Sequence, residues 1–217
     1  MSTSQDVDAP DPTAERMGGV GAVLSVELER ARAAGAASRT VILVEGVSDQ
    51  RAVEALARRR GRNLGSENVA IIPIAGATNL TRFLEMLGPT GHDVALAGLC
   101  DEGEEAQFLQ ALEQSGLGAG LTRSDMERLG FFVCVRDLEE ELIRSLGAGA
   151  VEAVIEAQGQ LKAFRSFQNQ PAQRSKVIER QLWRWMGNHK IRYASLLVDA
   201  LDLQKVPHPL ERVLENV

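Results

Sequence analysis

Residues 40–49 read TVILVEGVSD, and this stretch decides the fold. The run over 40–44 is continuously apolar and rich in β-branched residues, which is typical of a strand buried on both faces of a parallel sheet. Ser48 can cap the helix that we expect over 49–60. The stretch therefore predicts the first strand-to-helix unit of an α/β domain.

The alternation of strand and helix continues to residue 146. We expect three further buried strands at 69–74, 93–100 and 130–135, and helices at 79–87, 104–114 and 137–146. Strands separated by helices of this length indicate βαβ units with right-handed crossovers. The pattern predicts an α/β, Rossmann-like fold with a parallel four-stranded sheet and helices on both faces.

Two flanking segments complete the expected domain organisation. Residues 1–18 are acidic and polar, which predicts a disordered tail. The α/β domain is expected over 19–148, and it should begin with a short helix at 20–34 that Gly35 ends. Residues 149–217 carry helical patterns without a strand, so they predict an α-helical C-terminal extension, with helices at 150–156, 173–186 and 190–203 and a short final helix.

Composition excludes several classes of protein. The chain has 217 residues, of which 44% are hydrophobic and 25% charged, as in an ordinary globular domain. It has no apolar run of 18 residues and no signal-peptide pattern, so we expect neither a transmembrane helix nor a membrane partner. The two cysteines, Cys100 and Cys134, are too few for a disulfide framework or a zinc site. These features predict a soluble cytoplasmic protein with buried free thiols.

The net charge of −6 argues against a simple basic nucleic-acid-binding protein, but the charge is unevenly distributed. Residues 161–192 hold eight basic residues and one acidic residue. An acidic body with one basic stripe suits a site that holds metal ions beside a polyanion. The alternative is a pair of amphipathic helices with solvated charges. The residues that we expect to bind nucleic acid are Arg174, Lys176, Arg180, Arg184, Lys190 and Arg192.

Two other groups in the sequence favour structural interpretations. Trp183 and Trp185 could stack on bases, but two residues apart on a helix they cannot share one face. We therefore expect one in the core and one at the surface. Four arginines near the end of the 49–60 helix suit its negative C-terminal dipole, namely Arg58, Arg59, Arg60 and Arg62.

Carboxylates follow three of the four predicted strands. Because ligands of an open parallel sheet bind beyond the carboxyl ends of its strands, these side chains should gather at one edge. Like charges repel unless they are protonated or share a cation. Oxygen ligands with no His or Cys nearby select Mg²⁺ or Mn²⁺, which suits phosphodiester chemistry. The groups are Glu45 and Asp49, then Asp101, Glu102, Glu104 and Glu105, then Asp137 and 139–141.

Each carboxylate also has a structural interpretation. Asp49 could compensate the dipole of the first turn of its helix, and Asp101 could cap the helix that follows it. The run 139–141 could be a solvated helix face, of which one or two members at most point at the site. The coincidence of the three groups favours the functional interpretation.

The same segments resemble the Toprim domain. That domain has Glu-Gly after its first strand and Asp-x-Asp after its third. Here VILVEGVSD (41–49) ends one strand, IIPIAG (71–76) with Asn79 behind it ends another, and Asp101 ends a third. VRDLEEELI (135–143) is similar to a further acidic motif of OLD-family endonucleases, and HKIRYASLLVDAL (189–201) resembles their lysine-bearing C-terminal helix. The resemblance covers about residues 39–214 and implies a Toprim-like fold.

The resemblance also implies roles for the matching residues. Glu45 would be a metal ligand and general base, and Asp49 a second ligand of the same site. Asp101 would bind the metal shared with the scissile phosphate, and Glu139 would serve a second metal. Lys190 would be catalytic, because it would neutralise charge that develops on the phosphate. The implied cofactor is one or two Mg²⁺ or Mn²⁺ ions.

The sequence departs from the family pattern at two points. Gly103 stands where the family has the second Asp, and Glu104 could supply the missing oxygen as a metal ligand. The chain has no G-x-x-x-x-G-K-[ST] motif, although OLD-type enzymes join Toprim to an ATPase. The expectation is therefore a stand-alone Toprim protein, whose ATP dependence would need a separate ATPase partner.

The sequence thus predicts a metal-dependent endonuclease of OLD type that nicks or cuts DNA with little sequence specificity. The alternative is a catalytically degenerate Toprim module that binds nucleic acid or a partner ATPase, and Gly103 favours it. A weaker third hypothesis is a flavodoxin-like or receiver-like signalling domain, which leaves the basic extension without a role. The sequence does not determine whether the substrate is DNA or RNA, or whether it is single or double stranded. It also leaves open the pathway and the oligomeric state, for which a homodimer is one option.

Overall fold

The computed structural model describes residues 12–217, with side chains from residue 21 onward. Most of the predicted tail over 1–18 falls outside the described residues, and helix α1 (Pro12–Ala37) takes in its last positions. Gly35 does not end this helix as we expected. A Cβ there would lie 2.6 Å from the ring of His92, so the glycine instead lets α1 approach that side chain closely.

Four parallel strands form one sheet in the order β2-β1-β3-β4. They are β1 (Thr40–Val44), β2 (Val69–Pro73), β3 (Ala95–Asp101) and β4 (Phe131–Cys134). The parallel four-stranded sheet predicted from the sequence is confirmed. From β1 the chain moves to β2 on one side and later returns to β3 on the other, so the topological switch point lies between β1 and β3.

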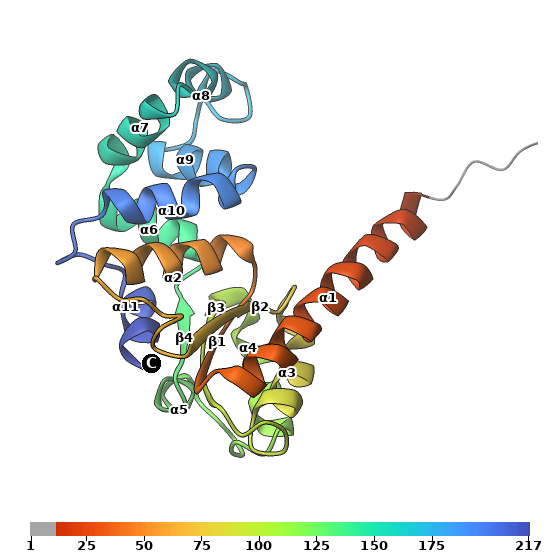
Figure 1. The fold of residues 1–217 in the computed structure, drawn as a ribbon. Helices are drawn as coiled ribbons and strands as arrows, with labels where there is room; N and C mark the ends of the chain where they lie inside the picture. Colours follow the sequence, from red (N-terminus) through yellow and green to blue (C-terminus); the bar gives the residue numbers. More distant parts are fainter. Residues whose placement is uncertain (1–11) are drawn as a thin grey trace, which may run out of the picture.

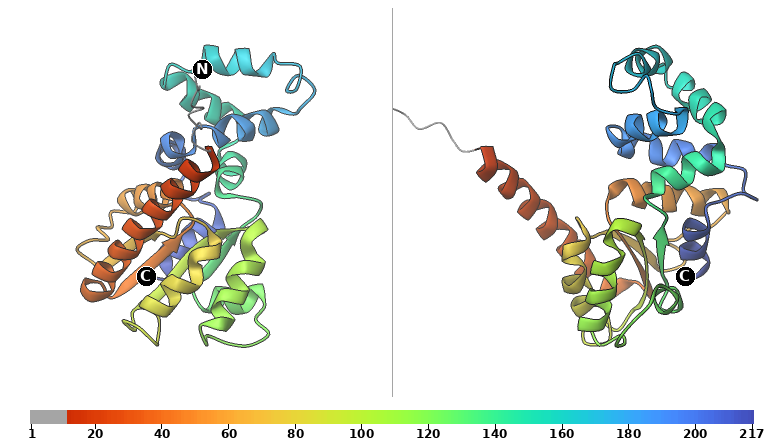
Figure 2. Two further views of the ribbon diagram at one scale, coloured as in Figure 1. Left: turned by 90° about the vertical axis from the view of Figure 1, so that its right-hand side faces the viewer. Right: turned by 180° about the vertical axis from the view of Figure 1, so that it is seen from behind.

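Helices cover both faces of the sheet (Figures 1 and 2). One face carries α1, α3 (Leu80–Leu87), α4 (Glu105–Gln114) and α5 (Arg123–Arg128). The other carries α2 (Val47–Arg59) and α11 (His208–Glu215), and a further layer of α10 (Lys190–Ala200) and α6 (Leu138–Leu146) packs on α2 through α10. Single 3-10 turns, η1 (Ala77–Asn79) and η2 (Glu102–Glu104), follow β2 and β3. The sequence did not predict the six-residue helix α5, which is too short to show a period. None of the described helices is long and apolar enough to cross a lipid bilayer.

The C-terminal extension is helical, as expected, but its helices differ in detail from the prediction. The elements α7 (Ala148–Ala157), α8 (Leu161–Gln168) and α9 (Ile178–Gly187) lie at the top of Figure 1. Residues 173–177 do not join α9, although we predicted a helix over 173–186. The side chain of Gln181 donates hydrogen bonds to the carbonyls of Gln173 and Lys176, at 2.9 and 3.1 Å, and these bonds hold the segment as a turn.

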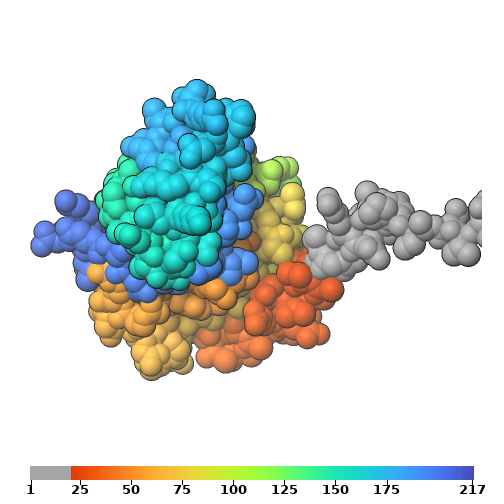
Figure 3. All heavy atoms as spheres, turned by 90° about the horizontal axis from the view of Figure 1, so that it is seen from above, coloured from red at the N-terminus to blue at the C-terminus, as the bar shows by residue number. Residues whose placement is uncertain are grey.

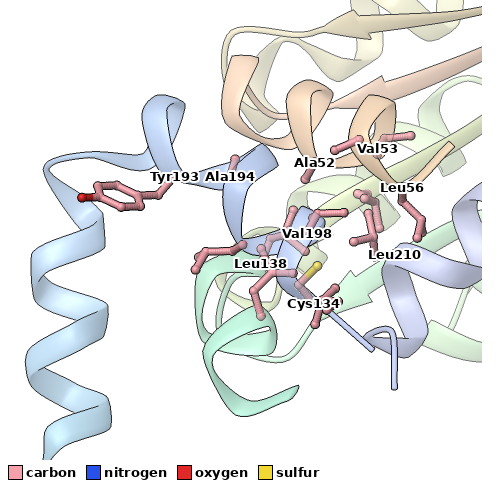
Figure 4. Close-up of a cluster of buried hydrophobic side chains, with 14 of the residues drawn as sticks. Ala52, Val53, Leu56, Cys134, Leu138, Tyr193, Ala194, Val198 and Leu210 are labelled. Atoms are coloured by element: carbon pink, nitrogen blue, oxygen red, sulfur yellow. The ribbon is translucent and has the colours of Figure 1, made fainter. Parts of the chain in front are cut away.

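One hydrophobic core joins the sheet to the extension. Leu56 of α2, Cys134 of β4, Val198 of α10 and Leu210 of α11 are buried in the same cluster (Figure 4). In the view from above, the teal and blue atoms of the C-terminal helices stand over the orange atoms of α2 (Figure 3). The domain division at 148/149 stays a prediction, and the core crosses it. Cys100 and Cys134 are buried and free.

The arginines at the end of α2 do more than meet the helix dipole, because they bind the C-terminal elements. Arg59 donates to the carbonyls of Val198 and Leu201 at 2.8 and 2.6 Å. Arg58 pairs with Asp199 at 2.9 Å across an exposed surface. Arg60 and Arg62 likewise reach acceptors in the last fifteen residues. These four arginines therefore connect the end of α2 to the C-terminal end of α10 and to the residues beyond it.

We expect Arg59→Met to lower the free energy of unfolding by about 1.5–3 kcal/mol, because both hydrogen bonds come from a charged donor. Arg58→Met is the matched control on the same helix, and its exposed ion pair should contribute less than about 1 kcal/mol. Urea denaturation followed by circular dichroism measures both changes. Equal losses in the two variants would contradict a special role for Arg59.

Candidate active site

Glu45 follows β1 and reaches across the switch point to β3. Its Oε1 accepts a hydrogen bond of 2.6 Å from the backbone N–H of Asp101. Burial raises the pKa of Glu45 to about 9, and hydrogen bonding to the side chain of Glu104 and the charge of Asp101 add to this rise. Within the described residues, Oε2 of Glu104 is buried without a hydrogen-bond partner. Glu104 therefore lies beside Glu45, and in the part of the chain that the structure describes its Oε2 is not engaged in a hydrogen bond that would compete with metal binding.

Asp49 lies in the first turn of α2, where its Oδ2 accepts a 3.0 Å hydrogen bond from the N–H of Gly46. Gly46 is thus the N-cap residue, and Ser48, which we expected there, is buried inside the helix. Burial and the charge of Glu139 raise the pKa of Asp49 to about 7. The structural interpretation of Asp49 is partly right, since the side chain does stabilise the start of its helix.

Asp101 ends β3 beside these two carboxylates. Burial and then the charge of Asp49 raise the pKa of Asp101 to about 7. Asp101 is the N-cap residue of η2, as the structural alternative expected, but in the described structure its side chain makes no capping hydrogen bond. Glu45, Asp49 and Asp101 line one small cavity, and the buried thiols of Cys100 and Cys134 line it as well.

Among the three glutamates that begin α6, Glu139 is the one that faces the site. It is 4% exposed, and its Oε2 accepts a 2.8 Å hydrogen bond from Nζ of Lys190 at the start of α10. Burial acts to lower the pKa of Lys190, but the charge and hydrogen bond of Glu139, together with the charges of Asp137 and Asp101, outweigh burial and keep the pKa above its ordinary value. Glu140 pairs with Arg136, and Glu141 accepts a hydrogen bond from the backbone just after β4.

Asp137 was expected among the carboxylates that follow the fourth strand, but the sequence analysis assigned it no role of its own. It is buried at the N-cap of α6, where Oδ1 accepts from the N–H of Glu140 at 2.8 Å. Its Oδ2 accepts a 2.6 Å hydrogen bond from Nε1 of Trp183 on α9. An Asp directly before a predicted helix is an N-cap signal, but the contact with Trp183 cannot be read from the sequence.

A cation contacts the ring face of Trp183, in addition to the hydrogen bond at its Nε1. The guanidinium of Arg136 lies 3.8 Å from the centre of its ring, and Arg136 itself has a left-handed backbone with φ of 71°. Such a conformation costs about 1–3 kcal/mol, which contacts with the surrounding structure must offset. Trp185 is 8% exposed and packs in the core, as expected for one of the pair, whereas Trp183 is partly buried against the core and does not lie at the surface as we expected.

The six basic residues predicted to bind nucleic acid do not form one surface. Lys190 and Arg184 line a cavity of 430 Å³ that also contains Asp137 and Glu139. Lys190 and Arg192 line a second cavity of 880 Å³ on the other side of the α9–α10 turn. The remaining three lie elsewhere: Arg174 and Lys176 donate to their own loop, and Arg180 lies 5.1 Å from the ring of Trp183.

The donor chemistry of the site fits a hard divalent cation. Every candidate ligand offers carboxylate oxygen, and the raised pKa values of Glu45, Asp49 and Asp101 show that their charged forms lack compensation. As the described side chains stand, no group of three or more His, Cys, Asp or Glu residues converges closely enough to hold an ion. Asp49 is turned to Gly46 and Glu139 to Lys190, so binding would require these side chains to rotate.

Comparison with known proteins agrees with this architecture. Residues 38–101 match the family model of the Overcoming lysogenization defect (OLD) protein-like TOPRIM domain. The C-terminal region of the Burkholderia pseudomallei OLD protein has 20% identity and a TM-score of 0.65, over 82% of this chain and 96% of that one. The C-terminal region of the Xanthomonas campestris pv. campestris OLD protein has 25% identity and a TM-score of 0.66, over 83% and 92%.

These matches confirm the predicted Toprim-type fold. They also show that the chain carries an OLD-like Toprim domain. A comparison with curated proteins found no significant match. The roles of the individual site residues stay predictions.

We expect stability to fall as the pH rises from about 4 to 7 in EDTA. The pKa of Asp101 is about 7 in the folded protein against 3.8 ordinarily, so in this window the folded chain keeps a proton that the unfolded chain has lost. One such group lowers the free energy of unfolding by at most about 1.4 kcal/mol per pH unit. Asp101→Asn should flatten this dependence.

Urea denaturation at a series of pH values measures the slope. Asp199→Asn, on the exposed surface of α10, is the matched control and should keep the slope of the unaltered chain. If Asp101→Asn and the unaltered chain lose stability equally over this range, Asp101 does not carry the extra proton.

Proposed function

Because the chain carries an OLD-like Toprim domain, we propose that it is a metal-dependent nuclease that hydrolyses DNA phosphodiester bonds with little sequence specificity. One observation carries the proposal. Glu45 and Asp101 meet at the switch point of the sheet, and Lys190 reaches Glu139 at the same edge from a helix 51 residues further along the chain. The carboxyl edge of an open parallel sheet is where such folds bind their ligands.

The residues have distinct proposed roles. Glu45, Asp49, Asp101, Glu104 and Glu139 would hold one or two Mg²⁺ or Mn²⁺ ions, which supply Lewis-acid polarisation of phosphoryl oxygens. Glu45 is the proposed general base, because the N–H of Asp101 fixes its orientation and its raised pKa indicates a high affinity for protons. Lys190 stays charged and would stabilise negative charge that develops on the phosphate.

Gly103 supports a second candidate function, a degenerate Toprim module that binds nucleic acid or an ATPase without cutting. A Cβ built on Gly103 meets no described heavy atom within 4 Å, so packing does not require a glycine here. An aspartate would fit, and its absence removes one carboxylate from the site. The neighbouring Glu104 favours the nuclease instead, because its buried oxygen lies within reach of Glu45. The separate ATPase partner and the homodimer stay predictions.

A plasmid-nicking assay tests the nuclease directly. We expect nicking with Mg²⁺ or Mn²⁺, none in EDTA, and a loss of about 100-fold or more in Glu45→Gln, because the variant keeps the shape of the side chain but not its basicity. Glu54→Gln on the exposed side of α2 is the matched control and should nick normally. A folded chain that nicks with neither metal would favour the degenerate module.

Gly103→Asp separates the two candidates further. If the site binds metal, the added carboxylate should shift half-maximal nicking to a lower Mn²⁺ concentration, by roughly 10-fold, since carboxylate count tunes affinity. Gly103→Asn adds similar volume without charge and controls for the change in shape. If the degenerate module is correct, the aspartate either restores nicking or leaves the chain inactive. Unchanged activity and metal dependence would show that position 103 lies outside the metal site.

A further inference from the structure

The larger of the two cavities beside Lys190 has a lining unlike the rest of this acidic chain. It is a groove of 880 Å³ between the start of α2, the end of α7, the α9–α10 turn and α10. Its cations are Arg51, Lys190 and Arg192, and none of the described residues that line it is acidic. The whole chain has 30 acidic and 24 basic residues, so the groove is a local reversal of the net charge. Such a lining fits an anion.

The cations of the groove come from α2 in the α/β domain and from α10 in the C-terminal extension. Arg51 of α2 is exposed, and its Nη1 donates a 2.9 Å hydrogen bond to the carbonyl of Ile191. That bond uses one of five guanidinium donors, so the others stay available. Arg192 is exposed and makes two long contacts with Gln158, at 3.4 and 3.5 Å. The backbone N–H groups that begin the 13-residue helix α2 add a partial positive charge.

The groove also exposes apolar side chains. Val47 is 39% exposed and Ile191 is 51% exposed, and both line it together with Leu196. A double helix hides the faces of its bases in the stack, whereas an unpaired strand exposes bases as well as phosphates. Cations beside apolar side chains therefore match a single strand better than a duplex, whose recognition is dominated by its phosphates.

The groove leads to the proposed active site. Gly46 and Ser48 line it, and they lie between Glu45 and Asp49 where β1 leads into α2. Lys190 lines the groove and pairs with Glu139. We infer that the groove binds a short unpaired stretch of nucleic acid, with Arg51 and Arg192 on its phosphates. The groove would direct this nucleic acid toward the carboxyl ends of the β-strands. The inference rests on the proposed nuclease for its purpose, but the binding itself does not require cleavage.

The test measures binding in EDTA, where cleavage cannot interfere. The full chain is titrated into a fluorescein-labelled 12-nucleotide single strand, and separately into a duplex of the same sequence, with fluorescence anisotropy as readout. We expect tighter binding of the single strand. Arg51→Gln with Arg192→Gln should weaken that binding by roughly 10-fold and reduce the slope of log affinity against log salt by about 0.7 per arginine, the value for a single strand.

Two further variants make the result specific. Arg58→Gln removes an exposed arginine from the same helix and the same α2–α10 contact but outside the groove, so it should bind as the unaltered chain does. Ile191→Asp puts a negative charge in the groove and keeps the backbone carbonyl that Arg51 contacts, so it should weaken binding without disturbing the helix pair. Thermal unfolding by circular dichroism verifies that each variant is folded.

The possible failures are distinguishable. Equal or tighter binding of the duplex overturns the inference, and so does a groove variant that binds no worse than Arg58→Gln. If the single strand binds through Arg51 and Arg192 but no metal supports nicking, the groove stands and the proposed nuclease fails. If nicking depends on Glu45 while the groove variants bind normally, the nuclease stands and the groove fails.

Discussion

The adjacency of β1 and β3 is the constraint on which the site depends. The connection that follows β1 runs to β2 on one side of the sheet, and the connection that follows β3 runs to β4 on the other side. The carboxyl ends of these two central strands are therefore left open between the two connections. Glu45 bridges this point through its hydrogen bond to the backbone of Asp101. A change of strand order would separate these residues, whatever their sequence.

Bringing carboxylates together is costly, and the structure shows how the cost is limited. Protons are held more tightly at Glu45, Asp49 and Asp101, whose pKa values all rise. The N–H of Gly46 stabilises Asp49, and Lys190 neutralises Glu139. The lysine comes from α10, which packs on α2 through the shared core and through the arginines at the end of that helix. The helical extension thus contributes to the site as well as to stability.

The same packing brings α2 and α10 together to form the groove beside Lys190. Arg51 is remote from the basic stripe in the sequence, yet it lines the same groove as Arg192, and its guanidinium donates to the carbonyl of Ile191. Of the stripe itself, Arg174 and Lys176 are engaged by their own loop. Charge along the sequence therefore indicated that a basic surface exists, and the fold determined which residues compose it.

Much of this protein follows from sequence alone, because buried parallel strands are continuous apolar runs and their ends are marked by a change to polar residues. The four apolar runs separated by helical patterns were enough to predict the sheet, and the acidic residues after three of the strands were enough to predict Glu45, Asp49 and Asp101 at one edge, whereas the choice of Glu139 among 139–141 rested on the family resemblance. Tertiary structure alone decided the strand order, the contact of Asp137 with Trp183, the turn at 173–177 and the pairing of Lys190 with Glu139. Local periodicity reports which face of an element is buried, whereas these contacts join residues far apart in the chain and depend on how the helices pack.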